Sequence, residues 1–249
     1  MKAQYTGKNT IHLAKVISTN SYTAELLSNS EPLAEGSVIM ADFQSGGRGQ
    51  SGAVWESKPE LNLLLTVFYR PHFLKIEDQF LLSIAISLAV CEFLEKYVSN
   101  VQVKWPNDIY VGDQKIAGLL IENSIQQHVI KNSIIGIGIN INQIEFSANT
   151  PHACSLQQLT GRNYDRELLL AELCDALEVK YEWIRNSTKQ TIQNAYLNKL
   201  FRYQQEAHFV IDDIAQTAKI VGIDGFGRLG LQLKEQVRYF NNKEISYIL

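Results

Sequence analysis

The chain has 249 residues, a length that suits one large domain or a core with a small appendage. Apolar residues make up 45% of the chain and charged residues 20%, the proportions of an ordinary folded protein. The net charge of −3 argues against a general affinity for nucleic acids, which requires clustered basic residues. We therefore expect a folded protein that does not bind DNA.

The cysteines and the apolar segments indicate the compartment. Cys91, Cys154 and Cys174 are odd in number and form no C-x-x-C pair, which fits a reducing compartment without disulfides or structural zinc. The N-terminus shows no secretory signal pattern. The longest apolar stretch, residues 80–91, is shorter than the roughly 20 residues that cross a bilayer. We expect a cytoplasmic protein without membrane contact.

The first hundred residues predict alternating strands and helices. Residues 18–21 form a polar cluster that suits a helix cap. Apolar residues recur with a helical period from Ile76 onward, as on a long amphipathic helix. The run LNLLLTVF is apolar throughout and predicts a strand buried on both faces. The predicted strands are residues 11–17, 37–43 and 61–68, and the predicted helices are residues 22–27 and 76–98.

The remaining sequence predicts a further mixed region and a β-rich end. A strong helix is expected at residues 165–185, with Asp165 as its N-cap. Three strands are predicted at residues 101–105, 114–122 and 134–141, with a hairpin turn at Gly112 and Asp113. After about Tyr203, five short strands are predicted at residues 207–214, 218–223, 229–233, 236–240 and 244–248.

These patterns predict an α/β chain of the α+β type. Five short strands in about forty residues are typical of a small barrel. We therefore expect a mixed sheet flanked by helices over residues 1–205 and a small β-barrel over residues 206–249.

Two glycine patterns imitate a dinucleotide-binding fingerprint. Residues 47–52 satisfy G-x-G-x-x-G, but Trp55, Pro59 and another predicted strand follow where the fingerprint requires a helix. Residues 225–230 also match, between two short strands, where hairpin turns explain the glycines. The chain has no P-loop, no H-E-x-x-H and no G-x-S-x-G, and its five histidines are scattered singly. The chemistry must come from other polar clusters.

The first such cluster is the glycine loop itself, GGRGQSGAVWES. Backbone without side chains can approach a ligand closely, and Arg48 supplies a fixed positive charge. The alternative is an ordinary surface turn.

The second cluster is Lys104-Trp105-Pro106-Asn107-Asp108. Lysine with asparagine suits phosphate and adenine contacts, and Asp108 could hold Mg²⁺ or orient a lysine. A simple turn explains residues 106–108 but leaves the adjacent Trp105 and Lys104 unexplained.

The third cluster follows two predicted strands. Lys115 opens an apolar strand in which Gly118 permits close backbone approach. Gly136 and Gly138 fall on one face of the next strand, since side chains alternate, and clear a shallow trough. A bulge and an edge lysine are the alternatives for each feature alone. Together, these cations, glycines and amides predict a site for an anionic ligand.

In this order the clusters resemble the biotin protein ligases, and the resemblance runs from about residue 11 to the C-terminus. It is carried by Ser18-Thr19-Asn20, GRGQSGAVWES, KWPND, KIAGLLIE and Gly138-Ile139-Asn140. The resemblance implies a core like that of class II synthetases and biotin–lipoate ligases, followed by an SH3-like barrel. It also implies an ATP-dependent, AMP-forming ligase. Such an enzyme joins biotin and ATP, with Mg²⁺, into biotinyl-5′-AMP and passes biotin to a lysine of a biotin carboxyl carrier domain of acetyl-CoA carboxylase or a related carboxylase.

The resemblance also assigns residues. It implies that biotin contacts Ser18, Thr19, Asn20, Gln44, Arg48, Gly49, Gln50, Lys115, Gly118 and Gly138. It implies that ATP contacts Lys104, Asn107 and Asn140, and that Asp108 lies near the metal or the incoming lysine. Because the reaction needs no covalent enzyme intermediate, the expected catalytic residues are positioned charges: Arg48, Lys104, Lys115 and Asp108.

Two departures from the family pattern stand out. Many relatives have arginine at the position of Gln50, so this loop lacks a cation. Seventeen residues precede Ser18, too few for the DNA-binding domain that some ligases carry, so no repressor activity is expected. A lipoate-attaching ligase of similar fold and a non-catalytic biotin sensor are the alternative functions. A homodimer formed across an exposed sheet edge is also an open expectation.

Overall fold

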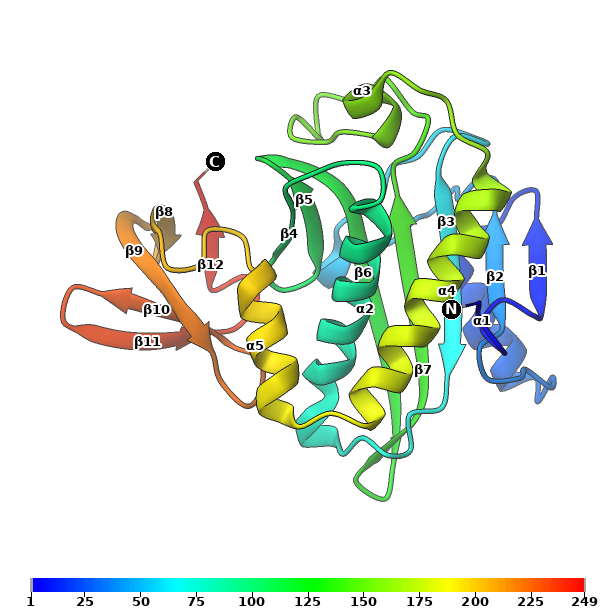
Figure 1. Cartoon of the computed structure of the whole chain (residues 1–249), viewed down its shortest axis with the longest axis horizontal. Coiled ribbons are helices and arrows are strands. Elements are labelled where there is room, and N and C mark those ends of the chain that lie inside the picture. The colour runs from blue at the N-terminus through cyan, green and yellow to red at the C-terminus, as the bar shows by residue number, and fades with distance from the viewer. Residues whose placement is uncertain (1, 249) are drawn as a thin grey trace.

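The protein is described here by a computed structural model covering residues 2–248 (Figure 1). Its larger sheet has seven strands in the order β1-β2-β3-β7-β6-β5-β4. All neighbours pair antiparallel except β1 and β2, so the sheet is mixed, as predicted. The strands are β1 (Thr10–Leu13), β2 (Val38–Ala41), β3 (Leu63–Tyr69), β4 (Val101–Lys104), β5 (Asp108–Val111), β6 (Gln114–Gln126) and β7 (Val129–Ile139).

Helices cover both faces of this sheet. Helices α2 and α4 lie over one face, and α5 lies beside α2 (Figure 1). Helix α1 packs on the opposite face, where Leu26 meets Ile39 and Phe68. Because side chains alternate along a strand, Val38 and Met40 of the same strand as Ile39 belong to the other core. The helices are α1 (Thr19–Ser28), α2 (Gln79–Leu94), α3 (Leu156–Thr160), α4 (Arg166–Arg185) and α5 (Lys189–Lys199).

The central helix is more deeply buried than its sequence pattern predicts. Of the sixteen residues of α2, twelve are buried. The prediction of an amphipathic helix over 76–98 was wrong in this respect, because α4 and α5 cover the side of α2 that faces away from the sheet. Residues 76–78 form a separate 3₁₀ turn before it. Among residues 2–248, no helix has the length and apolarity to span a bilayer.

The C-terminal strands form a second sheet, with all five strands near their predicted positions. They are β8 (Glu206–Ile211), β9 (Ile214–Ile223), β10 (Leu229–Leu233), β11 (Gln236–Phe240) and β12 (Ile245–Tyr247). Their order is β11-β10-β9-β8-β12, so the last strand returns to pair with the first. Within the described residues the sheet is open, with β11 and β12 as its two edges.

The structure also contains elements that the sequence did not predict. Strand β5 is four residues long and directly follows a turn, so its signal was masked by the Pro-Asn-Asp pattern. Helix α5 buries only Ile192 and Tyr196 and therefore shows no clear apolar stripe. The short α3 is marked by a capping box formed by Ser155 and Gln158. Asp165 caps α4 as predicted, accepting hydrogen bonds from two backbone N–H groups.

The N-terminal segment is attached to α4 by carboxylates, of which Glu178 makes the most hydrogen bonds. Glu178 accepts backbone N–H groups of Gln4 at 2.6 Å, Tyr5 at 3.0 Å and Thr6 at 2.7 Å. Burial alone would raise the pKa of Glu178, but these hydrogen bonds outweigh it, and the pKa is lowered from its ordinary value of 4.5. The charged form is therefore the one that holds the segment in place.

We predict that Glu178→Ala lowers the free energy of unfolding at pH 7 by about 1–3 kcal/mol, because three backbone donors lose their acceptor. A lowered folded-state pKa gives stability that is present above the unfolded pKa and is lost as the pH falls through the folded pKa. The difference in the free energy of unfolding between wild type and variant should therefore become smaller below about pH 4. Urea unfolding at pH 7 and pH 3 measures it, with Glu235→Ala in an exposed turn as the control. An equal difference at both pH values would contradict the assignment.

Candidate functional site

A cavity of about 380 Å³ opens on the face of the larger sheet that carries α1. Its walls come from the start of α1, the glycine loop, strands β4 to β7 and the segment 242–247 of the C-terminal sheet. Thirteen of the fourteen residues to which the resemblance assigns a role line it: Ser18, Thr19, Asn20, Gln44, Arg48, Gly49, Gln50, Lys104, Asn107, Asp108, Lys115, Gly118 and Gly138. The fold thus brings together clusters that are more than one hundred residues apart.

The end of the cavity at α1 is polar and internally hydrogen-bonded. Thr19 donates to the side-chain oxygen of Gln44 through its backbone N–H at 2.8 Å and its hydroxyl at 3.1 Å. Thr66 donates to Asn20 Oδ1 at 2.6 Å and lies 2.8 Å from Thr19 Oγ1. The polar cluster was predicted to precede the helix, but Thr19, Asn20 and Ser21 form the first turn of α1. Ser18 occupies the N-cap position without a side-chain capping bond. Sequence analysis missed Thr66 because it lies within an apolar strand.

The predicted trough is present and is occupied by side chains. A Cβ on Gly138 would lie 2.5 Å from the Trp55 ring, and one on Gly118 would lie 3.0 Å from it. A Cβ on Gly136 would lie 2.6 Å from Asn20 Oδ1. Gly118 and Gly138 are paired across β6 and β7, so the indole of Trp55 rests on a stretch of bare backbone. The glycines therefore provide room for groups to lie flat on the sheet.

One row of residues crosses four strands at the floor of the cavity. Lys104 of β4 pairs with Asp108 of β5, which pairs with Gly118 of β6, which pairs with Gly138 of β7. Residues paired in this way share a face of the sheet. The row therefore places a cation, an anion and two glycines side by side.

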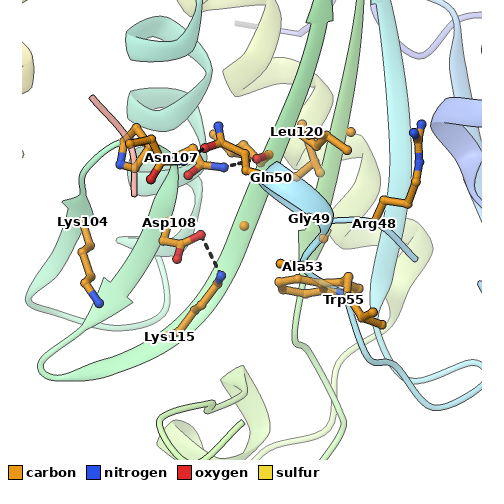
Figure 2. A pocket seen from close by; sticks show the side chains of 18 of the residues that line it. Arg48, Gly49, Gln50, Ala53, Trp55, Lys104, Asn107, Asp108, Lys115 and Leu120 are labelled. Carbon is orange, nitrogen blue, oxygen red and sulfur yellow. Dashed lines mark hydrogen bonds and ion pairs between the residues drawn. The ribbon is translucent and has the colours of Figure 1, made fainter. Parts of the chain in front are cut away.

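Lys115 joins this row through an irregularity in β6. Lys115 and Gly118 are three residues apart, so regular alternation would put them on opposite faces. The register shifts between Ile109 and Tyr110, leaving an extra residue in β6 and turning Lys115 to the face of Gly118. The backbone of Lys115 bonds instead to His152 O at 2.6 Å and to Cys154 N at 2.9 Å. As a result, Lys115 Nζ lies 2.7 Å from Asp108 Oδ1 (Figure 2).

Lys104 is held by aromatic side chains. Its ammonium donates to the hydroxyl of Tyr110 at 3.1 Å and lies 4.7 Å from the ring centre of that residue and 4.9 Å from that of Tyr247. Burial lowers the pKa of Lys104; Asp108 opposes the shift, and Lys115 and Arg202 add to it. Neither tyrosine was identified from the sequence, because nothing in the pattern links residue 247 to residue 104.

Arg48 points away from the other cations. Figure 2 shows its side chain directed away from Lys104 and Lys115. Its guanidinium is paired with the carboxylate of Glu122 at 3.2 Å. The same carboxylate accepts Asn20 Nδ2 at 2.7 Å. Glu122, which closes the KIAGLLIE motif, therefore links the glycine loop to the polar end of the cavity.

Asn107 and Asn140, both predicted to contact ATP, line different cavities. Asn107 donates its side-chain amide to the backbone oxygen of Leu119. Asn140 donates to Cys154 O at 3.0 Å, and its buried side-chain oxygen has no partner within residues 2–248. Asn140 does not line the main cavity; it lines a second one of about 270 Å³ under the loop 146–153. The two cavities share Val54, Trp55, Asp108 and Lys115.

The glycine loop also contacts the C-terminal sheet. Gln50 lies in a short 3₁₀ turn, and its side-chain oxygen accepts Asn242 Nδ2 at 2.6 Å. Arg48 and Val54 form a bridge that closes the loop on itself. In this structure the loop is thus a folded flap whose tip reaches the turn between β11 and β12.

Comparisons with known proteins agree with this site. Residues 13–140, just over half of the chain, match the Biotin/lipoate A/B protein ligase family. The chain is 31% identical over 244 residues to the bifunctional ligase/repressor BirA of Escherichia coli (strain K12), covering 94% of this chain and 71% of that protein. It is 30% identical over 187 residues to the BirA of Bacillus spizizenii, of whose length the match covers 56%. The chain thus spans little more than half the length of some relatives.

The fold agrees as well. The structure of a biotin protein ligase from Aquifex aeolicus in complex with biotin and ATP superposes with a TM-score of 0.79 at 26% identity, covering 96% of this chain and 98% of that one. The match therefore includes the C-terminal strands, which lie beyond the residues of the family match. Motifs, site geometry and fold lead to one conclusion: the chain belongs to the biotin/lipoate A/B protein ligase family.

Proposed function

We propose that this protein is a biotin protein ligase, which activates biotin with ATP and transfers it to a lysine of a biotin carboxyl carrier domain. The observation that supports this most directly is the pair of cavities that meet at Asp108, Lys115 and Trp55. A two-substrate adenylation requires two adjoining pockets with cationic groups at their junction.

The polar end of the main cavity suits the ureido ring of biotin. That ring offers two N–H donors and a carbonyl acceptor, and the hydrogen-bonded group of Thr19, Asn20 and Gln44 supplies partners for both kinds. The dithiolane ring of lipoate has no such groups, so it would gain no hydrogen bonds from these side chains. The site therefore favours biotin over lipoate. The aliphatic tail would lie over Gly118 and Gly138, with its carboxylate at Lys115.

The second cavity would take the nucleotide. Asn140 and the loop 146–153 would face the adenosine, and Lys104 and Asn107 would lie toward the phosphates. A biotin carboxylate oxygen would attack the α-phosphorus while pyrophosphate leaves, and Lys104 and Lys115 would stabilise the added negative charge. In the second step the carrier amine would attack the acyl carbon while AMP leaves. Arg48, released from Glu122, would close the flap over the intermediate and limit its hydrolysis.

Asp108 could supply the single carboxylate with which a protein often holds Mg²⁺ beside a nucleotide. No group of three or more metal-binding side chains was found among residues 2–248. Mg²⁺ at such sites is held through one or two carboxylates together with phosphate oxygens and water. When bound, the ion supplies positive charge to the phosphates. In this structure Asp108 is paired with Lys115. We propose that it orients the lysines in the absence of the ion and would hold the ion when the nucleotide is bound.

The remaining assignments are also proposals. We propose a boundary near residues 205 and 206 between the ligase domain and a small domain of the SH3-like barrel type, supported by the return of β12 to β8. We propose a cytoplasmic location, which the three free, buried cysteines support. Strand β1 is a half-exposed sheet edge across which two subunits could pair.

The principal test is the complete reaction. The protein is incubated with ATP, Mg²⁺, biotin and an apo carrier domain and probed with streptavidin. We expect a signal that depends on biotin and ATP, and biotin but not lipoate should support pyrophosphate exchange.

Lys115→Ala should lower the rate of pyrophosphate exchange by a factor on the order of 10²–10³, because the site loses a positioned charge and Asp108 loses its ion-pair partner. Lys75→Ala at an exposed site is the control. Biotin binding without ATP turnover would identify a sensor instead.

The glycine floor gives a second prediction. Gly138→Ala should displace Trp55 from its present position, since the added Cβ would lie 2.5 Å from the ring. We expect a loss of biotin affinity of about tenfold, the cost of roughly 1.4 kcal/mol of misfit. Calorimetry measures it. Gly225→Ala, where an added Cβ meets nothing within 4 Å, is the control. Unchanged affinity would show that biotin does not lie on this strand.

Gln50 gives the third prediction. Gln50→Arg should slow the release of biotinyl-AMP, because a charge contact at about 4 Å contributes roughly 1–4 kcal/mol that the amide lacks. The comparison is the rate at which labelled biotinyl-AMP leaves the wild type and the variant. Asn242→Ala, which removes the partner of Gln50 without adding charge, separates the lost contact from the added cation. Equal release from wild type and Gln50→Arg refutes the idea.

A further inference from the structure

We propose that Tyr247, contributed by the C-terminal sheet, is a positioning residue that holds Lys104 as the uncompensated cation of the nucleotide site. The proposal rests on the proposed function, because it assigns Lys104 to the phosphates. It gives the C-terminal sheet a defined task in the adenylation step.

The three cations singled out at the site are in different electrostatic states. Lys115 is paired with Asp108 at 2.7 Å, and Arg48 is paired with Glu122 at 3.2 Å. Within residues 2–248, Lys104 takes part in no ion pair of 4.0 Å or less. Before any rearrangement, Lys104 is therefore the one of these three whose charge is not offset by a carboxylate in contact with it.

Two aromatic rings contact Lys104 where the other two cations have a carboxylate. The ammonium lies 4.7 Å from the ring centre of Tyr110 and 4.9 Å from that of Tyr247, within the range of cation–π attraction. A ring attracts the cation without neutralising it, whereas a carboxylate would compete with an incoming phosphate. One of the three N–H donors of Lys104 is used by the hydroxyl of Tyr110. Two donors and the full charge remain available to an anion.

The ring of Tyr247 also packs against two phenylalanine rings. Tyr247 is paired with Phe209 in the antiparallel register of β12 and β8, and their ring centres are 4.9 Å apart. The ring centre of Phe201, which precedes the C-terminal sheet, lies 6.2 Å from that of Tyr247. The hydroxyl of Tyr247 is buried and has no hydrogen-bond partner within residues 2–248. The contact with Lys104 therefore depends on the ring and not on the hydroxyl.

The same contact lies where the C-terminal sheet borders the main cavity. Both Lys104 and Tyr247 line it, one on β4 and the other on β12. Without β12, Lys104 would keep only Tyr110 from its own hairpin, and its flexible side chain could turn toward Asp108, its partner across β4 and β5. That turn would remove the uncompensated charge from the site.

The test compares ring removal with hydroxyl removal. ATP affinity in the presence of Mg²⁺ is measured by calorimetry on the full chain. Tyr247→Leu should weaken it about fivefold to thirtyfold, the range expected for loss of a partly desolvated cation–π contact. Tyr247→Phe, which keeps the ring, should restore most of the affinity. In a Lys104→Met background Tyr247→Leu should have no further effect, since the two residues act through one contact.

Two controls keep the result specific. Tyr239→Leu, in the same sheet and outside the main cavity, reports general damage to that sheet, and it should leave ATP affinity unchanged. Biotin affinity without ATP should be the same in all Tyr247 variants. Equal ATP affinity in Tyr247→Leu and wild type, or a penalty that persists in the Lys104→Met background, overturns the proposal. A wild type that binds ATP but shows no biotin-dependent pyrophosphate exchange would reject the proposed function instead, and the affinity comparison would still decide the role of Tyr247.

Discussion

The row formed by Lys104, Asp108, Gly118 and Gly138 across β4 to β7 is the constraint on which the rest of the site depends. Antiparallel pairing sets these residues opposite one another, so a charged pair of strands lies beside a pair with bare backbone. Charge at one end, and at the other bare backbone on which a flat group such as the Trp55 ring can rest, is what a long ligand with an anionic tip requires. A shift of one residue in any of these strands would turn the participating side chain to the opposite face.

The elements around this row complete the cavity. The start of α1 places Thr19 and Asn20 against Thr66, which closes the polar end. The glycine loop lays Trp55 on the glycines and reaches the C-terminal sheet through Gln50. The C-terminal sheet in turn presents Tyr247 to Lys104. The molecule thus builds its cavity from three separate parts of the chain around one rigid floor.

Two of the three cations of the site are held in ion pairs. Asp108 pairs with Lys115, and Glu122 pairs with Arg48 and accepts a hydrogen bond from Asn20, so these two charges are compensated without a ligand. Lys104 instead lies against the rings of Tyr110 and Tyr247, which attract its charge without neutralising it. Anionic groups of the ligand can replace Asp108 and Glu122 as the partners of Lys115 and Arg48. Closure of the glycine loop would then start from this paired state.

The sequence by itself determined the family, thirteen of the residues that line the main cavity and most of the strands, because these depend on local motifs and on alternating or periodic apolar residues. It also indicated the glycine trough, since Gly136 and Gly138 must share a face. Only the tertiary structure decided that Lys115 lies beside Asp108. Strand alternation alone points it the other way, and the bulge in β6, bonded to His152 and Cys154, reverses its direction. Only the tertiary structure decided, too, that Arg48 is held by Glu122 and that Tyr247 reaches Lys104, because such contacts depend on the packing of distant segments rather than on any local pattern.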